Sequence, residues 1–429
     1  MARRLHFSSW LVPLALVVLL AAAEGQAWAQ TLNEGWQKLQ DEERKVHSRI
    51  VNFRKGVEKA DPNDQAHVEA IDVLAKTWTY GVYLQKLENQ PTKIDGDFGM
   101  FVRDVESILK AKNPQMMQPF GEVFRDKIRI HALEVLEFDQ ARAIHKIHNA
   151  RVLEKVAELG QPELADTLIK ILKDPKQNDG VRYYVLRGLG TLLAQVQPAD
   201  MTSVLSKQQQ ANCAEALVGF LEQRKGPSKN APPEEIDGFR WLRREAIRVL
   251  AKIHTPAVND KVRPALVLAR LAGNDESIQP PLRIDERVEA AIGLAHMKST
   301  QDKQYQPDYA AGQIAKCLGA FAQMTEDERT GRTKKKDAPS TRPWRIDAVM
   351  LKDALAALKT DSGKNAYVSQ MTARGTRLLD SIIAVKAIDP NELTWWNTAQ
   401  SDPPSKELFQ GSADSVVKPA PLAEAAPEK

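Results

Sequence analysis

The chain has 429 residues, a formal net charge of +4 and a hydrophobic content of 43%. This length corresponds to two or three globular domains or to one long repeat array. Acidic and basic residues alternate along the chain, which is typical of solvated helix faces and argues against a nucleic-acid groove. We therefore expect no nucleic acid partner.

Residues 1–29 have the pattern of a signal peptide. Arg3 and Arg4 precede an apolar stretch at residues 10–23, and Ala27-Trp28-Ala29 fits a cleavage site. The apolar stretch is shorter than the about 20 residues that span a bilayer. We expect cleavage near Ala29-Gln30, export to the periplasm or the extracellular space, and no later transmembrane segment. A retained membrane anchor is the alternative.

Residues 30–140 are predicted to form an N-terminal helical region. Apolar residues spaced by three and four predict a charged amphipathic helix over residues 32–60 and a further helix that begins after Asp64, its expected N-cap. Aromatic residues are dense here, but no repeat is visible. We interpret the region as a divergent cap, because the terminal unit of a repeat array needs one face adapted to water.

Residues 141–390 contain a helix that recurs at residues 181–190, 242–251 and, more loosely, 287–295. Each copy has an arginine, then apolar residues three, four and seven positions later, then Gly or Ala. The arginines are Arg182, Arg243 and Arg287. Such repeats are typical of stacked helical hairpins. The predicted fold class is all-α, an α-α superhelix of helical hairpins.

One stretch also carries a family resemblance. The run Leu159-Gly160-Gln161-Pro162-Glu163-Leu164, then Leu172-Lys173-Asp174-Pro175, then Val181-Arg182, resembles the HEAT-like repeat of the phycobilisome-lyase type. The resemblance implies a HEAT/ARM-like solenoid in which an Asp near the end of one helix and an Arg at the start of the next form an inter-repeat hydrogen-bond ladder. Asp174 and Arg182 match this pattern and Asp275 with Arg287 matches it loosely, while Arg243 is the corresponding arginine of the intermediate copy. A partner-binding role for these arginines is the alternative.

The same resemblance implies that the second helix of each hairpin lines the concave side of the solenoid. The candidate partner-binding residues on that side are Lys170, Lys173, Gln209, Arg263 and Arg270. The polar loop at residues 326–342 adds the densest charge cluster, Lys334, Lys335 and Lys336. This loop is the candidate for contact with an anionic envelope polymer or with membrane headgroups.

Residues 391–429 are rich in Pro and Ala and are predicted to be a disordered tail. Trp395 and Trp396 stand at its start. We expect this pair to close the last helix by burial, with an exposed recognition pair as the alternative.

No motif predicts a catalytic residue, a cofactor or a metal site. His145 and His148 are three positions apart, but no Asp or Glu follows at the spacing that a third ligand needs, so a polar helix face is expected. Gly188-Leu189-Gly190 follows no strand and therefore does not indicate a phosphate loop. Cys213 and Cys317 lie among small apolar residues and are expected to be buried free thiols.

The sequence therefore predicts an exported, non-enzymatic protein-binding or scaffolding module whose protein partner is not identified. The first alternative is an exported enzyme or enzyme accessory on a helical-toroid scaffold, which fold class alone does not distinguish from a scaffold. The second is an envelope-polymer-binding protein that acts through the loop at 326–342.

Overall fold

The computed structural model describes residues 34–85, 87–195, 203–228, 230–332, 344–398 and 401–411. All regular secondary structure in these ranges is helical and no β-strand occurs in them, which confirms the predicted all-α class. None of the described helices is long and apolar enough to cross a membrane. The signal peptide predicted at residues 1–29 lies outside the described residues.

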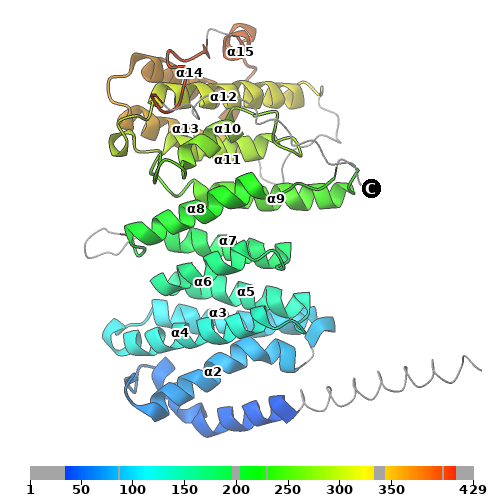
Figure 1. Ribbon diagram of the computed structural model, residues 1–429, viewed down its shortest axis with the longest axis vertical. Coiled ribbons are helices and arrows are strands. Elements are labelled where there is room, and N and C mark those ends of the chain that lie inside the picture. Colours follow the sequence, from blue (N-terminus) through cyan, green and yellow to red (C-terminus); the bar gives the residue numbers. More distant parts are fainter. Residues whose placement is uncertain are drawn as a thin grey trace, which may run out of the picture. The chain divides into compact units, whose positions relative to one another are not determined.

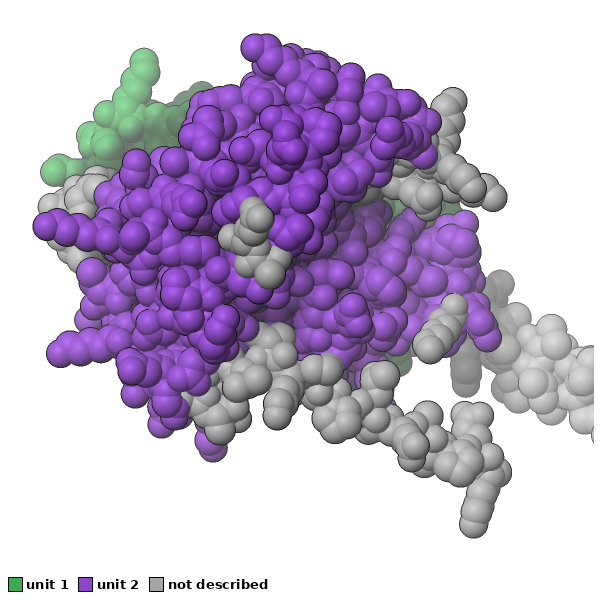
Figure 2. Space-filling view, turned by 90° about the horizontal axis from the view of Figure 1, so that it is seen from above, with its two compact units in different colours: residues 1–161 green, residues 162–429 purple. Residues whose placement is uncertain are grey.

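The chain divides into two compact units, residues 1–161 and residues 162–429 (Figure 2). The boundary lies beyond the division at residues 140 and 141 that the repeat pattern indicates, so the helix at Ala143–Val156 belongs to the first unit. This helix packs against three α-helices of that unit, which explains its assignment.

The first unit is a helical bundle around an aromatic core. Its helices are residues 34–54, α2 (Gln65–Leu84), η1 (Leu87–Asn89), α3 (Pro91–Leu109), α4 (Pro114–Glu137), α5 (Ala143–Val156) and η2 (Ala157–Leu159). α4 packs against α2 and α5, and its Phe120 and Phe124 stack with ring centroids 5.6 Å apart. Asp64 caps α2 by accepting hydrogen bonds from the N–H groups of Ala66 and His67, as its sequence position predicts.

The second unit consists of successive helices joined by turns and by longer loops. They are α6 (Pro162–Lys173), α7 (Asp179–Ala194), α8 (Lys207–Gln223), α9 (Pro233–Leu250), α10 (Pro264–Ala272), α11 (Ile284–Ala295), η3 (Ser299–Gln301), α12 (Pro307–Arg329), α13 (Trp344–Asp361), α14 (Ala366–Ile383) and α15 (Pro390–Trp396). Proline recurs at their first position, where its missing N–H has no intrahelical partner to lose and its fixed φ suits a helix.

The helices of the second unit pack in two layers (Figure 1). In one layer α6, α8, α10, α12 and α14 each contact the next, and in the other α7, α9, α11 and α13 do the same. The pairs α6 with α7, α8 with α9, α10 with α11 and α13 with α14 form hairpins that join the layers. Each helix thus buries an apolar stripe, such as Leu164, Leu168, Ile171 and Leu172 on α6.

The small residues at the ends of the first two copies of the recurring motif, Gly190 and Ala251, lie at close contacts between helices of one layer. A Cβ atom added to Gly293 of α11 would lie 2.5 Å from Cβ of Ala251, which follows α9. A Cβ atom on Gly190 of α7 would lie 3.2 Å from Val249 of α9. The Gly or Ala of the repeat pattern is therefore explained by helix packing rather than by ligand chemistry.

Part of the predicted disordered tail, residues 391–429, is packed. α15 buries Trp395 and Trp396 against the unit, as expected for that pair, and Leu408 and Phe409 are also buried. The backbone of Phe409 forms an isolated antiparallel bridge with Tyr305. The disorder prediction is wrong for residues 391–398 and 401–411, because a few large apolar residues anchor a segment of otherwise polar and proline-rich composition. Residues 412–429 lie outside the described residues.

The polar loop predicted at residues 326–342 begins as helix, since α12 continues to Arg329. Arg329 pairs with Glu326 one turn earlier, and this local ion pair supports the last turn of α12. Lys334, Lys335 and Lys336 lie outside the described residues.

Candidate functional site

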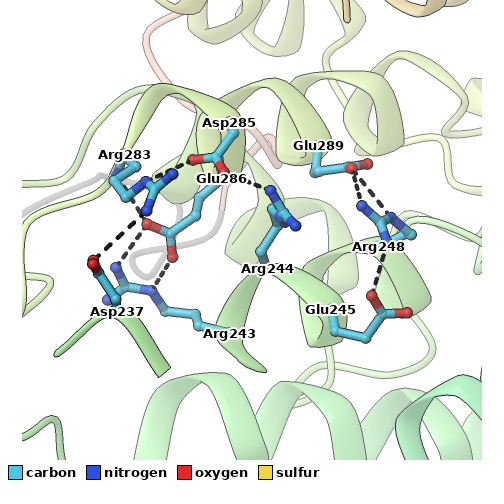
Figure 3. A network of polar contacts seen from close by, with 9 residues as sticks. All are labelled: Asp237, Arg243, Arg244, Glu245, Arg248, Arg283, Asp285, Glu286 and Glu289. Carbon is cyan, nitrogen blue, oxygen red and sulfur yellow. Dashed lines mark hydrogen bonds and ion pairs between the residues drawn. The ribbon is translucent and has the colours of Figure 1, made fainter. Parts of the chain in front are cut away.

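Three arginines of α9 pair with three carboxylates of α11 (Figure 3). Arg243 contacts Glu286 through Nε–Oε1 at 2.6 Å and Nη2–Oε2 at 3.1 Å. Arg244 donates to Asp285 at 2.6 Å, and Arg248 donates to Glu289 at 2.7 Å. Residues four apart share one face of a helix, so Arg244 and Arg248 on α9 meet Asp285 and Glu289 on α11 in matching order.

Five of the six side chains of this network are buried, and the sixth, Arg248, is 35% exposed. Glu286 is 1% exposed, Glu289 2% and Arg243 4%. A buried charge is costly unless it is paired and hydrogen-bonded, and each of these three side chains meets that condition. A carboxylate fixed in an ion pair is poorly placed to exchange protons with a substrate, so the network suits a rigid support better than acid–base chemistry.

A pocket of about 410 Å³ opens beside the network, near the N-terminal ends of α9 and α11. Its lining residues are Asp237, Gly238, Arg240, Trp241, Arg244, Arg283, Asp285 and Glu286. Arg283 lies 3.3 Å from Asp285 and 3.6 Å from Asp237, so the charged wall of the pocket is cross-linked by ion pairs (Figure 3). The pocket is therefore held in shape before any ligand arrives.

Trp241 is the exposed aromatic residue of this pocket. Its side chain is 51% exposed, and its indole stacks on the Tyr183 ring of α7 with ring centroids 4.6 Å apart and an interplanar angle of 26°. Trp, Tyr and Arg are the residue types enriched at binding hot spots. The stack holds Trp241 in one orientation, which lowers the entropy cost of using it as a contact.

The repeat arginines do not form the predicted Asp–Arg ladder. Arg182 does reach Asp174, but Nη2 donates to the backbone carbonyl at 3.0 Å, while the carboxylate of Asp174 accepts from the Gln177 side chain. Arg287 donates to the carbonyls of Ala272 at 3.2 Å and Lys316 at 3.0 Å. Both arginines therefore bind backbone carbonyls, and Arg182 also pairs with Asp179 of its own helix.

Two further pairings differ from the ladder. The loose match of Asp275 with Arg287 is wrong, since Asp275 binds Arg270 at 2.7 Å. Arg243 pairs with Glu286 of α11 rather than with an aspartate. A guanidinium has five donors on a long chain, so the repeat position fixes where an arginine lies but not which acceptor it takes.

The candidate partner-binding residues fall on the other layer from the one expected. Lys170 and Lys173 lie on α6, Gln209 on α8 and Arg270 on α10, while Arg263 is the N-cap residue of α10. These are the first helices of their hairpins, whereas the expectation placed the residues on second helices. The first hairpin of the second unit begins with α6 at Pro162, and the repeat spacing did not indicate this starting point.

Some of these candidate residues are exposed, and others are held in contacts within the fold. Lys170 and Lys173 are exposed. Gln209 completes a capping box with Ser206 and donates to the carbonyl of Pro162 at 3.0 Å. Arg263 lies over the Phe409 ring at 5.1 Å, and Arg270 binds Asp275 and Glu222. Of these five candidates, only the two lysines are therefore exposed enough to contact a partner.

A second polar cluster lies in the first unit between α2 and α4. Nε2 of His131 lies 2.9 Å from Oδ1 of Asp72, and Nδ1 lies 2.8 Å from the Tyr80 hydroxyl. An imidazole between a hydroxyl and a carboxylate is the arrangement of a nucleophilic triad. However, burial and Glu134 raise the pKa of the Tyr80 hydroxyl above its ordinary value, so the hydroxyl is a poor nucleophile. Lys76 and Lys127 also bind Asp72, which indicates a structural network.

The histidine pair and the two cysteines noted in the sequence have structural surroundings. Nε2 of His148 donates to the Trp78 carbonyl at 3.2 Å, and Nδ1 of His145 accepts from the Arg142 N–H in a capping box. In the described ranges no three His, Cys, Asp or Glu residues are grouped to hold a metal. Cys213 and Cys317 are buried free thiols as expected, and burial raises their pKa values to about 12 and about 11. Such thiols are unreactive at neutral pH.

Sequence reasoning did not single out Trp241, Tyr183 or the His131 cluster. Each depends on contacts between residues far apart in the chain, and no motif assigns a binding or catalytic role to any of them. The chain has no match among protein-family models, curated proteins or solved structures.

Proposed function

We propose that this protein is an exported, non-enzymatic scaffold that binds another protein through a HEAT/ARM-like α-α superhelix, of the type that the phycobilisome-lyase resemblance implies. The two-layer packing of the second unit supports this proposal, because each hairpin contacts its neighbours as in a repeat array. In this proposal the bundle of the first unit is the divergent cap. The signal-like pattern of residues 1–29 supports export.

The observation that carries the binding function is the half-exposed Trp241 at the edge of a pocket fixed by ion pairs. A tryptophan offers a large contact area with few rotatable bonds. The stack on Tyr183 and the α9–α11 ion pairs organise the site in advance, which favours tight binding at low entropy cost. The alternating charges around the rim favour specificity for a partner with complementary charges.

The two alternatives have less support. An enzyme would need a free acid, base or nucleophile, and Asp237, Asp285 and Glu286 of the pocket all lie in ion pairs with arginines. Envelope-polymer binding depends on Lys334, Lys335 and Lys336, which lie outside the described residues.

Site-specific photo-crosslinking in the producing cells tests the proposal. A photoreactive phenylalanine analogue replaces Trp241 in one strain and Val349 of α13, which is 45% exposed, in a control strain. We expect one discrete protein adduct from position 241 and none of the same mass from position 349. Identical adducts from both positions, or none from position 241, contradict the proposal.

A further inference from the structure

A second pocket lies between α6 and α8, apart from the Trp241 pocket. Its volume is about 540 Å³, and the lining residues that matter here are Lys173, Pro175, Arg182, Glu215, Phe220 and Arg224. Lys173 and Pro175 belong to the end of α6 and the turn after it, and Arg182 lies in the first turn of α7. The pocket therefore gathers charged side chains from three successive helices.

The two arginines of this pocket share one carboxylate. Arg182 binds Oδ1 of Asp179 at 3.2 Å, and Arg224 binds Oδ2 of the same residue at 2.6 Å. Lys173 has only a long contact with Glu215, at 3.9 Å. The three cations are thus set against two carboxylates, which leaves an excess of one positive charge.

The excess is located at the guanidinium groups. The Arg224 guanidinium lies 5.2 Å from the centre of the Phe220 ring and 4.7 Å from that of Phe239. Burial lowers the pKa of Arg224 although Asp179 opposes the shift, and the group still stays protonated at neutral pH. Within the described part of the chain, Nε of Arg182 and Nη1 of Arg224 are buried without a hydrogen-bond partner. Buried donors normally have acceptors, so these two unpaired N–H groups leave the positive charge of the guanidinium groups only partly neutralised.

The backbone around the pocket does not oppose an anion. Carbonyl groups at the end of a helix carry partial negative charge. Here Nη2 of Arg182 donates to the carbonyls of Asp174 and Pro175, at 3.0 and 3.3 Å, so a guanidinium covers the carbonyls that follow α6.

We propose that the pocket between α6 and α8 binds a single carboxylate, presented by an acidic side chain of a polypeptide partner. A planar guanidinium matches a carboxylate with two parallel hydrogen bonds. Pro175 and Phe220 offer an apolar wall for the methylene groups of such a side chain. An excess of one charge fits a monoanion better than a phosphate dianion or a polyanion. The inference deepens the proposed function and rests on it for the peptide source of the carboxylate.

Fluorescence anisotropy with the full-length protein tests this inference. The probes are a labelled peptide of alternating glutamate and alanine, the same peptide with glutamine for glutamate, and free acetate and inorganic phosphate as competitors. We expect the glutamate peptide to bind about tenfold or more tightly than the glutamine peptide, because hydrogen bonds to charged groups are strong. Equal binding of the two peptides overturns the inference. Displacement by acetate at peptide-like concentrations overturns the peptide source, and stronger displacement by phosphate overturns the carboxylate.

Three variants locate the site. Arg224→Gln should weaken the glutamate peptide about tenfold, whereas Glu215→Gln should tighten it about two- to fivefold, since the charge excess rises from one to two. Lys207→Gln removes an exposed cation at the start of α8, outside the pocket, and should change binding less than about twofold. Glu215 is 63% exposed, so its substitution leaves the fold intact, and unchanged or weaker binding by Glu215→Gln overturns the inference. The crosslink at position 241 reports on different residues, so either proposal can fail alone.

Discussion

Arg243 of α9 and Glu286 of α11 are joined by two parallel hydrogen bonds, 2.6 and 3.1 Å long, in a site from which water is almost excluded. The pair links two helices that are neighbours in one layer but not in the chain. Since the bidentate geometry allows little sliding, it fixes the register of α9 against α11. Both helices line the Trp241 pocket, so the pair also fixes the relative position of the walls of that pocket.

Removal of one member of this pair should destabilise the second unit strongly. Arg243→Leu leaves Glu286 charged and buried without its partner, which costs about 3–5 kcal/mol of unfolding free energy. Arg243→Leu with Glu286→Leu should recover most of the loss, because no uncompensated charge remains. Urea denaturation measures both. As a control, Lys352→Ala breaks the exposed pair with Asp380 and should cost less than about 1 kcal/mol. A double variant as unstable as the sum of the single variants would contradict this account.

The close contact at Gly293 gives a second test. Gly293→Ala places a methyl group 2.5 Å from Cβ of Ala251, so α11 must shift away from α9. We expect a loss of about 1–3 kcal/mol, as for other overpacked cores. Gly238→Ala on α9 is the matched control, because no atom lies within 4 Å of its added Cβ. That substitution should stabilise the protein by about 0.5–1 kcal/mol through helix propensity. The thermal unfolding temperatures of both variants test these expectations. A Gly293→Ala variant more stable than the wild type would contradict the close contact between α11 and α9.

His148 predicts a loss of stability in mild acid. Burial lowers the pKa of its imidazole from 6.5 to about 4, so the folded chain keeps the ring neutral while the unfolded chain takes up a proton. The free energy of unfolding is unaffected by this group above about pH 6.5. It falls as the pH falls towards about 4, by a total of about 3 kcal/mol. Urea denaturation between about pH 7 and pH 4 should show this decline in the wild type and a flatter profile in His148→Gln.

The control for this pH dependence is His47→Gln, at an exposed histidine of the first helix. It should leave the slope unchanged. Equal slopes for the wild type and His148→Gln would exclude His148 as the source of the decline.

Phe409 should hold the packed segment at residues 401–411. Its side chain is 1% exposed, and the backbone on either side forms hydrogen bonds from Gln306 N–H to Leu408 and from Gln410 N–H to Gln304. Phe409→Ala should release the segment, because a buried phenylalanine contributes about 3–5 kcal/mol. Hydrogen exchange of the Gln306 amide should then accelerate. Gln410→Ala, at an exposed side chain, should leave that amide protected, and protection that survives Phe409→Ala would show another anchor.

The sequence pattern was sufficient for features set by local chemistry. The all-α class, the cap at Asp64 and the buried thiols follow from apolar spacing, capping preferences and neighbouring residues. The Gly or Ala of the repeat was visible as well, and the structure supplies its reason in the contact between Gly293 and Ala251.

Features set by contacts between distant residues were not predictable in the same way. Arg243 and Arg287 look equivalent in the repeat, yet one pairs with a carboxylate and the other with two carbonyls, since each takes the acceptors that its neighbouring helices present. From the sequence Trp241 is one more apolar residue of α9, and only the structure shows that it is 51% exposed and stacked on Tyr183 of α7. The order Tyr80, His131 and Asp72 likewise arises from helix packing alone.

The segment that covers α12 limits how this fold can grow. A Cβ atom on Gly312 would lie 2.5 Å from Pro403, and one on Gly319 would lie 2.8 Å from Asn397, so the two glycines make room on α12 for these two residues. Repeat proteins lengthen in evolution by duplication of hairpins. A duplicated hairpin added on this surface would compete with the residues that already pack there. A duplicate inserted beside the α8–α9 hairpin would instead pack against the helices of neighbouring hairpins. Length variation among relatives of this protein should therefore arise within the stack rather than at the glycine-lined face of α12.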